Sequence, residues 1–135
     1  MKDFSFKSKY GFDDLCEIMR LLREPGGCPW DREQTHESIK SSFIEETYEV
    51  IEAINKNDKT LMCEELGDVL FSAVNVARFL GVDSEEALTK ASNKFLRRYL
   101  IVEKLAKERN IDMKATPIEE LDKLWAEAKK SLESN

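Results

Sequence analysis

The amino-acid sequence predicts an all-α protein, an antiparallel bundle of about five helices. Apolar residues recur at spacings of three and four along most of the 135 residues, which is the period of amphipathic helices. β-branched residues never alternate with polar residues as they do in half-buried strands. Glycine and proline are scarce, at five and three residues. The length fits one domain, and we expect a single helical domain over residues 1–135.

Local start and stop signals give the approximate bounds of the five helices, which are 12–23, 35–55, 58–81, 84–109 and 116 onward. The turn EPGGCPWD (24–31) ends the first helix with two prolines and two glycines. Asp58 is an N-cap for the third helix, and Gly81 suits the position just after its end. The sequence Thr116-Pro117-Ile118-Glu119 places an N-cap, a proline at the first helical position and a glutamate two residues further on.

The expected third helix is unusually apolar. Between Leu66 and Leu80 its polar residues are Gly67, Asp68, Ser72, Asn75 and Arg78. A helix that is apolar on most sides is normally buried on most sides. One thin bundle of this length would not cover it, so we expect a homodimer or higher homo-oligomer in which dimerisation completes a four-helix core.

Glu46 interrupts an apolar stripe on the expected second helix. Ile39, Phe43, Val50 and Ile54 follow one another at helical spacing, and the same stripe passes through position 46. Burying a carboxylate without a partner costs several kcal/mol, on the order of a lost buried ion pair. We therefore expect Glu46 to have a specific electrostatic partner.

Two consecutive helices carry the same arrangement of carboxylates. Glu46 and Glu49 are spaced i, i+3, and so are Glu65 and Asp68, so each pair projects from one helix face. The polar line of the third helix continues through Ser72 and Asn75, which predicts a wet or ion-filled cavity. Four converging carboxylates repel one another unless a cation lies between them. Hard oxygen ligands favour Mg²⁺, with Mn²⁺ as a substitute.

Composition excludes several other classes of protein. The formal net charge of −6 argues against a nucleic-acid binder. Three widely spaced cysteines form neither a zinc motif nor a disulfide framework, which indicates a reducing cytoplasm. No apolar run is long enough to span a membrane. A di-iron site requires two ExxH pairs, and His36 supplies a single one far from Glu46.

Four motifs in order along the chain resemble the MazG-type nucleoside triphosphate pyrophosphohydrolases. EETYE (45–49) and EELGD (64–68) are similar to the EExxE and ExxD signature of that family. GGCPWDREQTHES (26–38) resembles the preceding CPWDxxQTH segment. NKFLRR (93–98) and LDKLWAEAK (121–129) resemble two later elements. Many family members contain two such domains in tandem, and this sequence contains one.

The resemblance implies an all-α protein that uses Mg²⁺ to hydrolyse (deoxy)nucleoside triphosphates to the monophosphate and pyrophosphate. The expected role in the cell is house-cleaning of the nucleotide pool. By position, the metal ligands would be Glu46, Glu49, Glu65 and Asp68. Glu45 would support these ligands or position water, and Glu45 or Glu49 would act on the attacking water.

Substrate-binding residues follow from the later motifs. Lys94 and Arg98 are spaced i, i+4 and would contact phosphate oxygens. Trp125 and Lys129 share that spacing, and the resemblance implies that they contact the nucleotide. Trp125 has an alternative role as a core anchor for the last helix. The alternative to an enzyme is a non-catalytic regulatory module that binds a nucleotide or a metal.

Overall fold

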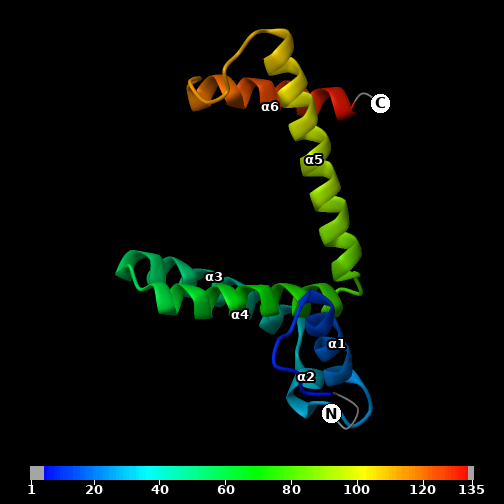
Figure 1. Cartoon of the computed structure of the whole chain (residues 1–135). Helices are drawn as coiled ribbons and strands as arrows, with labels where there is room; N and C mark the ends of the chain where they lie inside the picture. Colours follow the sequence, from blue (N-terminus) through cyan, green and yellow to red (C-terminus); the bar gives the residue numbers. More distant parts are fainter. Residues whose placement is uncertain (1–4, 134–135) are drawn as a thin grey trace. The chain divides into compact units, whose positions relative to one another are not determined.

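The computed structural model describes residues 5–133 and confirms the all-α prediction for them. The helices are α1 (Phe12–Arg23), α2 (Pro29–Glu33), α3 (His36–Lys56), α4 (Lys59–Phe79), α5 (Ser84–Glu108) and α6 (Ile118–Glu133) (Figure 1). Within this part of the chain, every helix is too short or too polar to cross a membrane.

The chain divides into two compact units, with the division just after Glu86. The first unit contains α1 to α4 and the beginning of α5. The second contains the rest of α5 and α6. A single domain over 1–135 stays a prediction, and residues 1–4 and 134–135 lie outside the described part of the chain.

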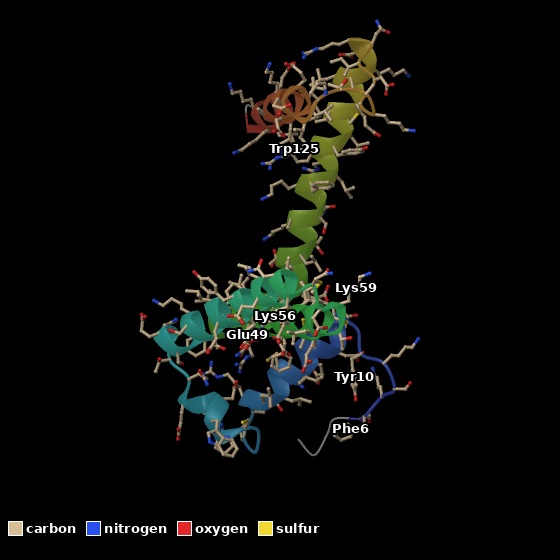
Figure 2. The ribbon with its side chains drawn as sticks, turned by 90° about the vertical axis from the view of Figure 1, so that its left-hand side faces the viewer. Phe6, Tyr10, Glu49, Lys56, Lys59 and Trp125 are labelled. Atoms are coloured by element: carbon tan, nitrogen blue, oxygen red, sulfur yellow. The ribbon has the colours of Figure 1, made fainter. Side chains whose placement is uncertain are left out.

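The centre of the first unit is a hairpin of α3 and α4, which lie side by side (Figure 1). Asn57 ends α3 in the left-handed conformation, with φ of 52°. Asp58 then caps α4, because its Oδ1 accepts hydrogen bonds from the backbone N–H groups of Thr60 and Leu61 at 3.0 and 3.1 Å. Lys56 and Lys59 lie on either side of this connection (Figure 2). The predicted cap at Asp58 is confirmed.

The start of α3 is also confirmed. Thr35 is its N-cap, and the Thr35 hydroxyl accepts a hydrogen bond from the Ser38 backbone N–H at 3.1 Å. The Ser38 hydroxyl in turn accepts one from the Thr35 N–H at 2.9 Å. These reciprocal bonds set the first turn of the helix that carries Glu46 and Glu49.

The apolar stripe on α3 differs from the prediction at one end. Ile39 is buried, and Phe43 and Val50 are half-buried, but Ile54 is 56% exposed. Ala53 is fully buried in its place. A small side chain at position 53 lets the two helices approach closely beside their connection, and this approach turns Ile54 away from the interface.

The single chain does not bury the third predicted helix on most sides, as expected for a helix that one thin bundle cannot cover. Leu66, Leu70 and Phe71 of α4 are 52, 58 and 43% exposed, whereas Ser72 and Val74 are buried. The first unit packs α3 and α1 against α4 and leaves the rest of its apolar surface uncovered. In the single chain, this part of the apolar helix is therefore surface, and its burial in an oligomer stays a prediction.

The turn 24–31 contains a short helix that was not predicted. Pro29 is the first residue of α2, where its missing N–H costs no hydrogen bond. The helix is only five residues long, which is too short to show a period in the sequence. The two glycines before it make the tight return from α1, with Gly26 at φ of 92°.

The second unit pairs α5 with α6 around a core of Val102, Ala106, Leu124 and Ala128. The start of α6 differs from the expected capping box. The Pro117 carbonyl accepts the first helical hydrogen bond, from the Leu121 N–H at 3.2 Å, so the helix begins one residue later, at Ile118. The Thr116 hydroxyl donates instead to the Asp112 carbonyl, at 2.7 Å.

We predict that Gly27→Ala destabilises the chain, by about 2 kcal/mol or more. A Cβ at this position would lie 2.2 Å from the Leu22 carbonyl oxygen and 2.6 Å from that of Leu21, so the turn could not close. The free energy of unfolding in urea measures the effect. Gly67→Ala is the matched control, because a Cβ at this position meets no atom within 4 Å. The substitution also removes a glycine from the interior of α4. It should stabilise the chain by about 0.5–1 kcal/mol.

Candidate functional site

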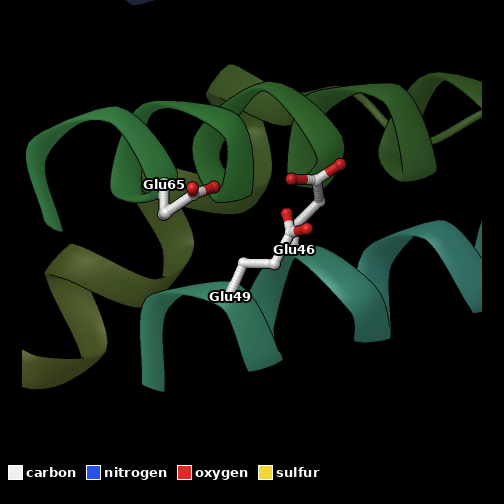
Figure 3. Close-up of side chains that lie close together, drawn as sticks. All are labelled: Glu46, Glu49 and Glu65. Atoms are coloured by element: carbon white, nitrogen blue, oxygen red, sulfur yellow. The ribbon is translucent and has the colours of Figure 1, made fainter. Parts of the chain in front are cut away.

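Three glutamates from the two helices of the hairpin meet between them. Each of Glu46, Glu49 and Glu65 offers one carboxylate oxygen, and these oxygens lie within 4.8 Å of one another (Figure 3). The i, i+3 spacing places Glu46 and Glu49 on one face of α3. Glu49 lies seven residues before the end of α3 and Glu65 six residues after the start of α4, so the hairpin brings them to the same level.

The electrostatics of this group favour a bound cation. Burial raises the pKa of the Glu46 carboxyl above its usual value, and so do four neighbouring carboxylates, Glu49, Asp68, Glu65 and Glu45. Burial likewise raises the pKa of Glu65, followed by the charges of Glu49, Glu64 and Asp68 and by a hydrogen bond with Glu49. Each carboxylate thus makes it harder for the next to ionise. A divalent cation would reverse this effect.

The spacing of the three oxygens suits a small hard cation. Octahedral Mg²⁺ holds its ligands at about 2.1 Å, so ligand oxygens around one ion lie roughly 3.0–4.2 Å apart. One carboxylate oxygen from each of the three glutamates lies within 4.8 Å of the others, which is close to this range. All three ligands are carboxylates, which suits Mg²⁺ or Mn²⁺ better than zinc.

Asp68 and Glu45 lie at the edge of this group. Asp68 is exposed and is not among the carboxylates that converge in the described chain, although its charge acts on both Glu46 and Glu65. Glu45 is also exposed, and its charge raises the pKa of Glu46. The structure therefore brings three of the four predicted ligands together. The ligand role of each residue stays a prediction.

Asn75, at the end of the polar line on α4, was predicted to face a wet or ion-filled cavity, and the structure gives it a different partner. Arg78 donates one hydrogen bond to each carboxylate oxygen of Asp31, both at 2.7 Å, and a further one to the Asn75 side-chain oxygen. Asn75 therefore faces a buried ion pair and not a wet cavity. The sequence analysis missed this pair. Its only signal was Arg78, the one basic residue within the apolar part of the helix.

The remaining predicted residues belong to the second unit. Lys94 and Lys129 are exposed, and Arg98 is half-buried. Trp125 (labelled in Figure 2) is half-buried and packs against the core of this unit, with its ring 5.4 Å from that of Phe95. This contact fits the alternative role of Trp125 as an anchor for the last helix. Nucleotide binding by these four residues stays a prediction.

His36 has a structural contact of its own. It is the first residue of α3, and its ring meets the Phe79 ring edge-on, with 4.8 Å between the centroids. It is not among the converging metal-ligand candidates of the described chain. His36 thus lies in the first turn of α3 and packs on the last residue of α4.

An all-α hairpin that opposes EExxE on one helix to ExxD on the next defines a class of helical domain with facing carboxylate motifs. Sequence comparison places the chain within one family of this class. The model of the MazG nucleotide pyrophosphohydrolase domain matches residues 34–114, which contain both carboxylate motifs. The chain belongs to this family, and the resemblance seen in the motifs is confirmed.

Curated relatives support the assignment. The chain is 47% identical over 92 residues to the nucleoside triphosphate pyrophosphohydrolase/pyrophosphatase MazG of Thermotoga maritima, a match that covers 65% of this chain and 36% of that protein. It is 41% identical over 92 residues to the nucleoside triphosphate pyrophosphohydrolase of Escherichia coli K12, covering 64% of this chain and 35% of that protein. The match thus spans about a third of each relative.

A solved structure supports the fold. The crystal structure of a MazG-related protein from Thermotoga maritima is similar to this chain, with a TM-score of 0.63 and 32% sequence identity. The similarity covers 87% of this chain and 98% of that one.

We predict that Glu46→Gln stabilises the metal-free protein near neutral pH. Because the pKa of Glu46 is raised in the folded chain, its charged form costs stability above that pKa, and the cost disappears as the pH falls towards 4.5. In EDTA, the variant should melt at a higher temperature than the unmodified chain near neutral pH, and the difference should shrink in acid. Thermal unfolding followed by circular dichroism tests this.

Glu52→Gln is the matched control for this prediction. Glu52 is an exposed residue of the same helix whose carboxylate pairs with Lys56 at 3.3 Å. Its replacement should not reproduce the stabilisation. A lower melting temperature for Glu46→Gln in EDTA near neutral pH would contradict the prediction.

Proposed function

We propose that this chain hydrolyses (deoxy)nucleoside triphosphates to the nucleoside monophosphate and pyrophosphate in a metal-dependent reaction. The observation that carries the proposal is the convergence of Glu46, Glu49 and Glu65 between α3 and α4. Family membership supports the same chemistry. A polyphosphate is strongly anionic, and so is this group of carboxylates. Only a cation between them makes the encounter favourable.

Glu46, Glu49 and Glu65 would hold Mg²⁺, with Mn²⁺ as a substitute, and Asp68 would complete the set. When bound, Mg²⁺ would neutralise phosphate charge and lower the pKa of the water that it coordinates. Glu45 or Glu49 orients the attacking water and accepts its proton. The water oxygen bonds to the α-phosphorus, the bond from that phosphorus to the α–β bridging oxygen breaks, and pyrophosphate leaves with that oxygen.

In this proposal, residues of the two later motifs contact the substrate. Lys94 and Arg98 are four residues apart on α5, so their side chains project from the same face of the helix. Two cations on one face can contact the same polyphosphate. Trp125 and Lys129 have the same spacing on α6. In this proposal they contact the nucleotide, and the protein acts in the cytoplasm to clear the nucleotide pool.

The proposal includes a homodimer or higher homo-oligomer. Ile44, Tyr48 and Ile51 are 56, 64 and 46% exposed and form an apolar stripe on α3 at spacings of four and three. α4 carries exposed leucines of its own, and a single chain rarely leaves so much apolar surface in water. A second copy of the chain would cover it.

We predict that Ile51→Glu weakens this association. The variant places a charge at one end of the apolar stripe. It leaves the α3–α4 interface unchanged, because Ile51 is exposed. Analytical ultracentrifugation at micromolar concentration should give a smaller mass for Ile51→Glu than for the unmodified chain or for Glu52→Gln. A monomer mass for the unmodified chain would contradict the oligomer.

The proposed reaction predicts specific products. The purified chain, incubated with Mg²⁺ and a panel of ordinary, deoxy and modified nucleoside triphosphates, should release pyrophosphate and the monophosphate in equal amounts. Ion-pair chromatography separates these from orthophosphate and the diphosphate, whose appearance would contradict the assigned bond. Binding without turnover across the panel would favour the non-catalytic module.

Glu46→Gln links the products to the carboxylate group. Loss of one ligand charge should reduce turnover by on the order of 100-fold or more. Helix content should not change, since the amide has the same shape. Glu52→Gln changes the same residue type on the same helix and should keep full activity. Near-normal turnover of Glu46→Gln would remove Glu46 from the proposed ligands.

A further inference from the structure

The two ends of the α3–α4 hairpin are held by different means. At one end, Asn57 and Asp58 connect the helices covalently. At the other end, α3 begins at His36 and α4 ends at Phe79, and side-chain contacts must hold the helices together there. The orientation of α3 about its own axis depends on both ends.

One contact at this second end is the Asp31–Arg78 ion pair. Two hydrogen bonds of 2.7 Å join the Arg78 guanidinium to both oxygens of the Asp31 carboxylate, across 47 residues of sequence. Asp31 and Arg78 are only 9 and 12% exposed. A bidentate pair in a buried position fixes direction as well as distance, because the two planar groups must face each other. It therefore links α2 to α4.

Two aromatic contacts to Phe79, the residue after Arg78, also lie at this end of the hairpin. The His36 ring meets the Phe79 ring edge-on at 4.8 Å, and the Arg23 guanidinium lies 5.1 Å from the centre of the Phe79 ring. Only Gln34 and Thr35 separate α2 from α3. Asp31 is thus held to α4 a few residues before the first turn of α3.

A metal site is sensitive to that orientation. A carboxylate stands roughly 6 Å from the axis of its helix, so a rotation of about 10° moves it by about 1 Å. Metal–ligand distances tolerate only about 0.2 Å, and Mg²⁺ requires near-octahedral geometry. A small rotation of α3 would therefore separate Glu46 and Glu49 from Glu65.

We propose that Asp31 and Arg78 are positioning residues for the carboxylate group: their ion pair orients α3 so that Glu46 and Glu49 meet Glu65. This inference rests on the proposed metal-dependent function. Under this proposal, Asp31 of the CPWD segment affects metal affinity. Neither Asp31 nor Arg78 is among the converging carboxylates of the described chain.

Titration of the whole chain with Mn²⁺ alone tests the inference, with free Mn²⁺ measured by electron paramagnetic resonance. Asp31→Asn and Arg78→Lys should each raise the Mn²⁺ dissociation constant by about three- to tenfold, less than the loss of a group that touches a ligand. Arg78→Lys keeps the charge and loses the paired hydrogen bonds, so it separates orientation from charge neutralisation. The Asp31→Asn/Arg78→Gln double variant leaves no buried charge unpaired and secures a folded comparison.

The matched control is the Arg109–Glu127 ion pair of the second unit, also 2.7 Å long but about half exposed. Arg109→Gln/Glu127→Gln should bind Mn²⁺ like the unmodified chain. Asp31 and Arg78 variants that melt at a lower temperature but bind Mn²⁺ with unchanged affinity would overturn the inference and show a purely structural pair. Failure of the unmodified chain to bind Mn²⁺ would overturn the proposed function itself, and the inference with it.

Discussion

Repulsion among the carboxylates between α3 and α4 is the constraint on which the rest of the structure depends. Glu46, Glu49 and Glu65 lie together in a position where burial and mutual charge raise the pKa values of Glu46 and Glu65. The hairpin must hold them against this repulsion, because a group that separated freely would not bind a metal. The apolar contacts of Ile39 and Ala53 on the same helix face offset the electrostatic cost.

The hairpin solves this problem by restraint at both ends. The Asn57–Asp58 connection aligns the levels of the two helices, so that residues equally far from the turn oppose each other. The buried Asp31–Arg78 pair and the Phe79 contacts act at the other end. Buried ion pairs contribute little net stability, because desolvation offsets much of their attraction, but their geometry is specific. A site that needs orientation more than stability suits such a pair.

The sequence predicted helices more accurately than it predicted their surroundings. Helix bounds followed from caps and turn residues such as Thr35 and Asp58, whose signals are local. Which residues of α4 stay exposed, such as Leu66 and Leu70, could not be predicted, because this depends on how many neighbours the fold places around α4. The helix α2 was missed since one turn shows no period. The Trp125 side chain packs on Phe95. Helical spacing alone could not show whether Trp125 contacts the protein core or a nucleotide.

The sequence by itself determined the all-α class, the family and the carboxylates that share a helix face, because helical periodicity and motif order are properties of neighbouring residues. The tertiary structure decided which of those carboxylates meet. It brought Glu65 to Glu46 and Glu49, left Asp68 at the edge, and paired Asp31 with Arg78 across 47 residues. These outcomes depend on the rotation of one helix against another, which only packing between distant parts of the chain sets.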